Sequence, residues 1–153
     1  MHRRSEIAIL EELTRATCRS ADRCTVASRA GGESSHRRIV IEQLCEDRRL
    51  LLVDLIRCLL MRGVPVADVR RAITSLPCTA FAAVDIDVIW IDVEIAERKL
   101  HRVLRAALQD PALSDSVREL LSLHYLRIKL HHDELDGLGE RHTFPDAVQP
   151  LHA

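Results

Sequence analysis

The sequence predicts an all-α protein, in the simplest form a four-helix bundle, and three observations support this fold class. The five glycines and five prolines fall in a few places and leave four long blocks between them. Helix interiors exclude both residue types, whereas turns collect them. Apolar residues recur at helical spacing within the blocks. Because 47% of the residues are hydrophobic but only 3% are aromatic, aliphatic side chains must build the core, as helix packing allows.

The same pattern divides the 153 residues into a single bundle domain at 1–138 and a C-terminal tail at 139–153. In the first block the helical spacing runs from Ile7 to Cys24 and fades before Gly31. The second block is broadly apolar, so we expect it to be the most buried helix. The four helices are expected at about residues 4–30, 35–62, 80–109 and 114–136.

The last two blocks carry the most regular spacing. It runs from Ile86 through Ala107 in the third block and from Val117 to Leu138 in the fourth. Residues 85–95 are rich in Ile and Val and could instead form a strand. We prefer a helix, because no second strand candidate is available to pair with this segment.

The connection between the second and third helices is too long for a tight turn, and a short extra helix over Asp68–Ser75 is compatible with its length. Fully extended, residues 64–77 would reach roughly 46–50 Å, enough to cross the bundle lengthwise. An up-down bundle and a ferritin-type arrangement with a crossover connection therefore both stay open.

Composition and charge exclude several classes of function. A net charge of −1 gives no field to attract nucleic acid or anionic lipid, and no apolar segment is long enough to span a bilayer. The five cysteines include no CxxC pair, so we expect reduced thiols. No apolar stretch follows Arg3 and Arg4, which argues against a signal peptide. We therefore expect a cytoplasmic protein with neither a nucleic-acid nor a membrane partner.

Polar side chains interrupt the apolar seams at similar depths. One such residue on each helix lies about 13 to 16 residues from the nearest predicted turn. At 1.5 Å per residue, these side chains are expected to meet near the middle of the bundle. The expected structural polar layer consists of Thr17, Arg48, Glu97 and His124.

Two interpretations of this layer compete. In the first, Arg48 pairs with Glu97 while His124 hydrogen-bonds nearby, which satisfies the buried charges and fixes the helix register. In the second, inward carboxylates and imidazoles bind iron or another divalent metal, as in di-iron bundles. We prefer the first, because an inward arginine is a poor neighbour for a cation. The candidate metal ligands are Glu94, Glu97, His124 and His131, completed by Glu11, Glu42 or Glu46.

The last two helices also contain a set of motifs: Glu94-x-x-Glu97, an Asp110–Pro111 turn, Val117-Arg118-x-Leu120-Leu121 and Ile128-x-x-x-His132-Asp133-x-x-x-x-Leu138. This set resembles the small bacterial ferritin-like four-helix-bundle proteins that are grouped as a domain of unknown function. The likeness covers residues 5–138 and is most specific over 85–138. It implies a ferritin-like bundle that could bind metal through Glu94, Glu97 and His132, with His132 in place of His131.

The chain departs from the di-iron pattern of ferritin-like proteins, which place two Glu-x-x-His motifs in mid-helix. That spacing occurs at Glu33 and His36, beside a helix end. At Glu42 and Glu119 the residue three positions later is not histidine. We therefore do not expect an intact di-iron site.

The sequence thus predicts a non-enzymatic ferritin-like bundle that acts by self-association or by binding a protein partner. The alternative is an iron-binding bundle with a storage, redox or peroxide-related role. A third, weaker interpretation is a helical regulatory adaptor.

Overall fold

The computed structural model describes residues 4–29, 35–74 and 86–143, which form five helices and no strand. The all-α prediction is confirmed. Within this part of the chain, no helix is long and apolar enough to cross a membrane. The helices are α1 (Glu6–Arg29), α2 (Ser35–Met61), α3 (Val66–Thr74), α4 (Ile86–Gln109) and α5 (Asp115–Thr143).

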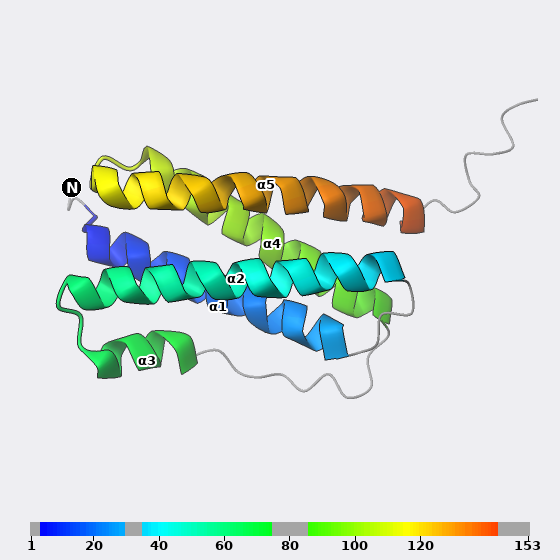
Figure 1. The fold of residues 1–153 in the computed structure, drawn as a ribbon, viewed down its shortest axis with the longest axis horizontal. Coiled ribbons are helices and arrows are strands. Elements are labelled where there is room, and N and C mark those ends of the chain that lie inside the picture. Colours follow the sequence, from blue (N-terminus) through cyan, green and yellow to red (C-terminus); the bar gives the residue numbers. More distant parts are fainter. Residues whose placement is uncertain (1–3, 30–34, 75–85, 144–153) are drawn as a thin grey trace, which may run out of the picture.

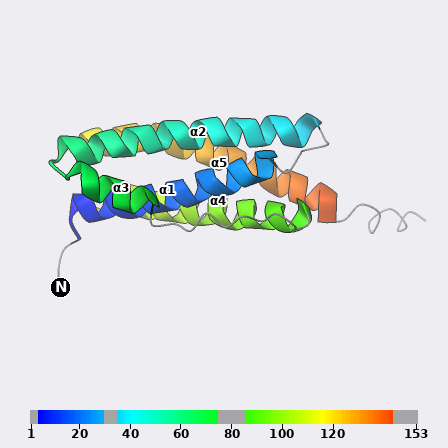
Figure 2. The ribbon, with the colours of Figure 1, turned by 90° about the horizontal axis from the view of Figure 1, so that it is seen from below.

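Four long helices lie side by side along the molecule, and the short α3 packs against α1 and α2 (Figure 1). The helix α1 contacts both α2 and α4, and α5 likewise contacts α4 and α2. The pairs α1–α5 and α2–α4 therefore lie diagonally opposite each other. The view along the other axis shows the same lengthwise packing (Figure 2).

The long helices α2 and α4, which only the short α3 separates in the order of helices, run in the same direction (Figure 1). The ends of α2 and α4 and the starts of α1 and α5 meet at one end of the molecule (Figure 1). Hydrogen bonds hold these helix ends together. Arg62, just after α2, donates to Glu6 at the start of α1 and to Ser114 just before α5. A simple up-down bundle would make α2 and α4 antiparallel, so the observed order matches the crossover arrangement that the sequence left open.

Local chemistry sets several helix ends. Ser5 caps α1, since its hydroxyl accepts a 3.1 Å hydrogen bond from the Ala8 N–H. After α2, Gly63 adopts a φ of 81°, and the Val64 N–H bonds the Leu59 carbonyl at 3.1 Å. This is a Schellman motif, whose left-handed position favours glycine.

The observed helix bounds differ from the expected ones in three places. The short helix α3 runs over Val66–Thr74, close to the expected 68–75. The helix α4 is described from Ile86, so the expected start near residue 80 lies outside the described residues. The helix α5 continues to Thr143 instead of ending at 136. Glycine weakens a helix by about 1 kcal/mol but does not forbid it, unlike proline.

The core consists of two apolar clusters with polar side chains between them. The larger cluster lies toward the end that carries α3 and includes Leu10, Leu55, Leu104 and Leu121. The smaller cluster surrounds Trp90 toward the other end. The buried polar side chains of the described residues are Thr14, Thr17, Ser20, Arg48, Glu97, His124 and His131.

Candidate functional site

An ion pair between Arg48 of α2 and Glu97 of α4 lies at the centre of the molecule. The Arg48 Nε donates to Glu97 Oε1 at 2.7 Å, and Nη2 donates to Oε2 at 2.5 Å. Each side chain is 1% exposed. Burial alone would lower the pKa of Arg48, but the charge and hydrogen bonds of Glu97 raise it. The Arg48 guanidinium therefore stays charged, and its two hydrogen bonds to Glu97 have the fork geometry that suits arginine.

Ser20 of α1 completes this central layer, because its hydroxyl donates to Glu97 Oε1. Thr17 is buried at the expected depth but does not join the group. Its hydroxyl donates to the Leu13 carbonyl of its own helix at 2.7 Å. A threonine in mid-helix commonly bonds back to the carbonyl four residues earlier. Three helices thus contribute to the layer, and α1 does so through Ser20 in place of Thr17.

The two histidines on the α5 seam face α2. His124 Nε2 lies 2.7 Å from Asp54 Oδ2, and His131 Nε2 lies 3.2 Å from Asp47 Oδ2. We expected His124 beside Glu97. It instead contacts Asp54, which lies six residues after Arg48 on α2. The predicted depth of each residue was counted from the nearest turn, and the turns used for α2 and α5 lie at opposite ends of the bundle. Small errors in the two counts therefore add up to a difference of one or two helical turns.

The remaining candidate ligands lie apart from the central layer. Glu94, one turn before Glu97, is half-buried. His132 turns toward α4 and stacks on His101 with 5.3 Å between ring centroids. His101 also stacks on Tyr125 at 5.2 Å. Burial and then the nearby His132 lower the pKa of His101.

The five candidate metal ligands thus fall into separate environments. Both oxygens of Glu97 accept hydrogen bonds from Arg48, two histidines pair with aspartates of α2, and His132 stacks against α4. Among the described residues, no group of three or more His, Cys, Asp or Glu side chains is arranged to hold a metal ion.

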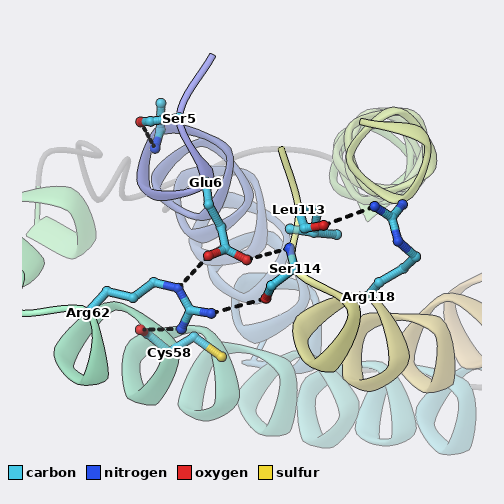
Figure 3. Close-up of polar contacts among 8 residues, drawn as sticks. Ser5, Glu6, Cys58, Arg62, Leu113, Ser114 and Arg118 are labelled. Atoms are coloured by element: carbon cyan, nitrogen blue, oxygen red, sulfur yellow. Dashed lines mark hydrogen bonds and ion pairs between the residues drawn. The ribbon is translucent and has the colours of Figure 1, made fainter. Parts of the chain in front are cut away.

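A second polar network joins three helix ends near the start of α1 (Figure 3). Glu6 accepts hydrogen bonds of 2.7 Å from Arg62 Nε and from the Ser114 N–H. Arg62 also donates to the Cys58 carbonyl at 3.0 Å and to Ser114 Oγ at 3.3 Å. Burial opposes ionisation of Glu6, but the hydrogen bonds from Arg62 and Ser114 outweigh it and lower its pKa to about 2.

Arg118 stabilises the turn between α4 and α5 in a similar way. Its guanidinium donates to the carbonyls of Leu108, Asp110 and Leu113, of which the contact with Leu113 is visible in Figure 3. The Leu108 carbonyl belongs to the last turn of α4, where backbone acceptors lack helical partners, and the Asp110 and Leu113 carbonyls lie in the connection to α5. Together the two networks fix the positions of the start of α1, the end of α2 and the α4–α5 turn relative to one another.

Comparisons with known proteins leave the chain without an assigned family. No protein-family model matches it, no curated protein matches it, and no solved structure matches it. The all-α fold is thus shown by the structure, whereas the resemblance to ferritin-like bundles stays a prediction.

Several residues of the candidate site were missed by the sequence reasoning. Asp47 and Asp54 are spaced by seven residues, the same separation as His124 and His131. Two neighbouring helices with matching seven-residue polar spacing can form two cross-helix pairs in either relative direction, so the spacing was a signal that the sequence offered. Ser20 had a weaker signal, since it lies beside the narrow seam traced through Thr17.

Proposed function

We propose that this protein is a non-enzymatic ferritin-like four-helix bundle that acts by self-association, with a second copy of the same chain as its partner. The observation that carries the proposal is a pair of exposed apolar stripes on α4 and α5. Seven residues from the centre of each stripe lie charged residues, which are acidic on α5 and basic on α4.

The interior of the molecule supports a structural role. The charged side chains of the central layer are paired inside the bundle, and the flanking histidines contact carboxylates of α2. A surface hollow between α1 and α4 is lined by Arg19, Asp92 and Lys99 and includes no member of the central layer. Interior polar groups that satisfy one another fix a fold and leave little capacity for substrate chemistry.

The exposed face of α5 carries Leu123, Leu126 and Leu130, each 60% to 64% exposed. Residues spaced by three and four positions lie on one helix face. The outer face of α4 carries Val88, Ile91 and Ile95 in the same spacing, each 45% to 61% exposed. Scattered exposed apolar residues are ordinary, but aligned apolar stripes mark interaction surfaces.

The charges beside each stripe favour pairing between α4 of one copy and α5 of the other. On α5, Glu119 lies seven residues before Leu126, and Asp133 lies seven after it. On α4, Arg98 lies seven residues after Ile91. Seven residues are about two turns, so the two charged positions lie at equal distances from the apolar centres.

With Ile91 opposite Leu126 of a second copy, Arg98 faces a carboxylate whichever way the partner helix runs. Pairing α5 with α5 would instead oppose acidic residues, and pairing α4 with α4 would oppose arginines in the parallel orientation. The charge pattern therefore favours a two-fold dimer in which each α4 packs on the partner's α5, the commonest symmetry of homo-oligomers.

Light scattering coupled to size-exclusion chromatography, or sedimentation equilibrium, tests this proposal over a range of protein concentrations. The wild-type chain should have the mass of a dimer, and Leu126→Glu should shift it to the monomer. The matched control is Leu50→Glu, at an exposed leucine on α2 that is 42% exposed, and it should stay dimeric. A monomeric wild-type chain, or equal effects of the two variants, would overturn the proposal.

Metal analysis of protein purified without chelator distinguishes the iron-binding alternative. Near-stoichiometric iron that is lost on Glu97→Ala, with the helical content retained, would favour that alternative over a purely structural role.

A further inference from the structure

A hollow on the surface between α1 and α4 lies beside the central layer. Its lining consists of Arg19, Asp22 and Arg23 of α1 and of Asp92, Ile95, Ala96 and Lys99 of α4. Ser20 and Glu97, the chain neighbours of two lining residues, form the hydrogen bond that joins these helices. The hollow has a volume of about 230 Å³, below the roughly 300–1,000 Å³ of sites for drug-sized ligands. A ligand that fits it must therefore be small.

Two cations lie at the same end of this hollow. The helices α1 and α4 are antiparallel, because the start of α1 and the end of α4 lie at one end of the molecule (Figure 1). Arg19 lies one residue before Ser20, and Lys99 lies two residues after Glu97. In antiparallel helices these two steps lead in the same direction. Because Ser20 and Glu97 are hydrogen-bonded, Arg19 and Lys99 differ in level by one residue, about 1.5 Å.

The two carboxylates of the hollow lie farther from this cationic end. Asp22 is three residues from Arg19, which corresponds to about 4.5 Å along the helix axis. Asp92 is seven residues from Lys99, which corresponds to about 10.5 Å in the same direction. Ile95 lies between Asp92 and Lys99 and gives the hollow an apolar wall. The hollow is therefore cationic at one end and acidic toward the other.

The charges of the cationic end are not balanced within the protein. Among the described residues, neither Arg19 nor Lys99 has a hydrogen-bond or ion-pair partner, and both side chains are exposed. Arginine offers a planar fork of donors that matches the oxygens of a phosphate, and lysine binds phosphate as a point charge. An anion bound between the two cations would reduce their mutual repulsion.

We propose that the cationic end of the hollow binds a phosphate dianion, either free or as the phosphate group of a small molecule. A phosphate group carries a charge of about −1.5 to −2 at pH 7, which matches the two charges of Arg19 and Lys99 better than a single carboxylate does. The rest of the hollow leaves room for a small organic part beside Ile95. Like charges at Asp22 and Asp92 would repel a second phosphate group at the other end.

The site lies within one copy of the chain and involves no covalent step. It therefore goes beyond the proposed self-association without depending on it, and it is compatible with a non-enzymatic protein. Sedimentation of Arg19→Gln should give the same mass as the wild-type chain, so a failure of the phosphate site and a failure of the dimer can be told apart.

Phosphorus NMR of the full chain tests the site, in a low-salt buffer that contains no phosphate because salt screens exposed charges. The probes are inorganic phosphate and glycerol phosphate. The signal of at least one probe should shift or broaden with a saturable dependence on protein concentration, and unphosphorylated glycerol should not compete. Tighter binding of glycerol phosphate would identify a small phosphorylated molecule as the ligand, and tighter binding of inorganic phosphate would identify the free ion.

Two charge-neutralising variants and a matched control locate the bound phosphate. Arg19→Gln and Lys99→Gln should each weaken binding of the probe by about tenfold, the loss expected for one charge-assisted hydrogen bond. Arg102→Gln is the control, because Arg102 is an exposed cation on α4 three residues after Lys99 and lies outside the hollow. It should leave the affinity unchanged. Circular dichroism should show wild-type helix in all three variants, since each side chain is exposed.

Three results would overturn the proposal. The first is the absence of saturable binding by either probe at millimolar concentrations. The second is an unchanged affinity in Arg19→Gln or in Lys99→Gln. The third is an equal loss in Arg102→Gln and Lys99→Gln, which would show that phosphate responds to the overall charge of the surface and not to this hollow.

Discussion

Arg48 and Glu97 join two helices that lie diagonally opposite each other in the molecule, with both guanidinium–carboxylate hydrogen bonds buried. The long side chains of arginine and glutamate span the interior, where α2 and α4 do not pack directly. Because the fork geometry fixes both distance and direction, this pair sets how far α4 can slide along α2. Ser20 adds α1 to the same register.

Breaking the central pair should be far more costly than removing both partners. Arg48→Met leaves the Glu97 carboxylate buried without a cationic partner, so the free energy of unfolding should fall by about 3–5 kcal/mol. The double variant Arg48→Met/Glu97→Leu should recover much of that loss, because no charge stays buried. Denaturant unfolding followed by fluorescence of Trp90, the only tryptophan, measures both effects.

Arg49→Met provides the matched control for this prediction. Arg49 forms an exposed ion pair with Glu46, and such pairs contribute about 0–1 kcal/mol. A cost for Arg48→Met as small as that for Arg49→Met would contradict a buried, charge-paired centre.

The contribution of Glu6 to stability should depend on pH. Because its pKa is lowered from 4.5 to about 2 in the folded protein, the stabilisation is complete above pH 4.5 and is lost as pH falls toward 2. The difference in unfolding free energy between wild type and Glu6→Gln should be about 2–3 kcal/mol at pH 7 and about 1 kcal/mol at pH 3. Urea unfolding at a series of pH values measures this difference.

Glu12→Gln is the comparison for the pH series, since Glu12 forms an exposed ion pair with Arg4. Its effect should stay close to zero at every pH. A difference between wild type and Glu6→Gln that is constant from pH 7 to pH 3 would show that the network with Arg62 and Ser114 does not hold Glu6 ionised.

Gly63→Ala should destabilise the protein by about 1 kcal/mol through backbone strain alone. Gly63 has a φ of 81°, and a Cβ added there meets no atom within 4 Å. The left-handed conformation is unfavourable for alanine by roughly 1–2 kcal/mol, whereas asparagine tolerates it better. Thermal unfolding should therefore rank the variants as wild type, then Gly63→Asn, then Gly63→Ala. Equal melting temperatures for wild type and Gly63→Ala would contradict the Schellman geometry.

Charge reversal tests the proposed dimer register independently of its apolar contacts. Arg98→Glu should weaken association by about tenfold, because it places like charges together at two symmetry-related positions. Adding Glu119→Arg should restore association if the paired helices are antiparallel, and Asp133→Arg should do so if they are parallel. Sedimentation equilibrium measures each variant. Restoration by neither second change would contradict the pairing of α4 with the partner's α5.

Glycine and proline positions together with helical periodicity determined the all-α class and the approximate helix bounds. These are local properties, since an exclusion of proline or a spacing of apolar residues acts within a single helix. The same local reasoning failed at Gly137 and Gly139, where α5 continues to Thr143. A glycine lowers helix stability without blocking the helical conformation.

Tertiary structure alone decided which polar residues meet. The sequence placed Arg48 and Glu97 at one depth, but it also assigned Thr17 and His124 to that layer, where the structure has Ser20 and separate histidine–aspartate pairs. A shift of one turn, about 5.4 Å, exchanges one partner for the next. Periodicity defines the inward face of each helix, but the relative sliding of helices depends on packing between them. That sliding decides the pairs.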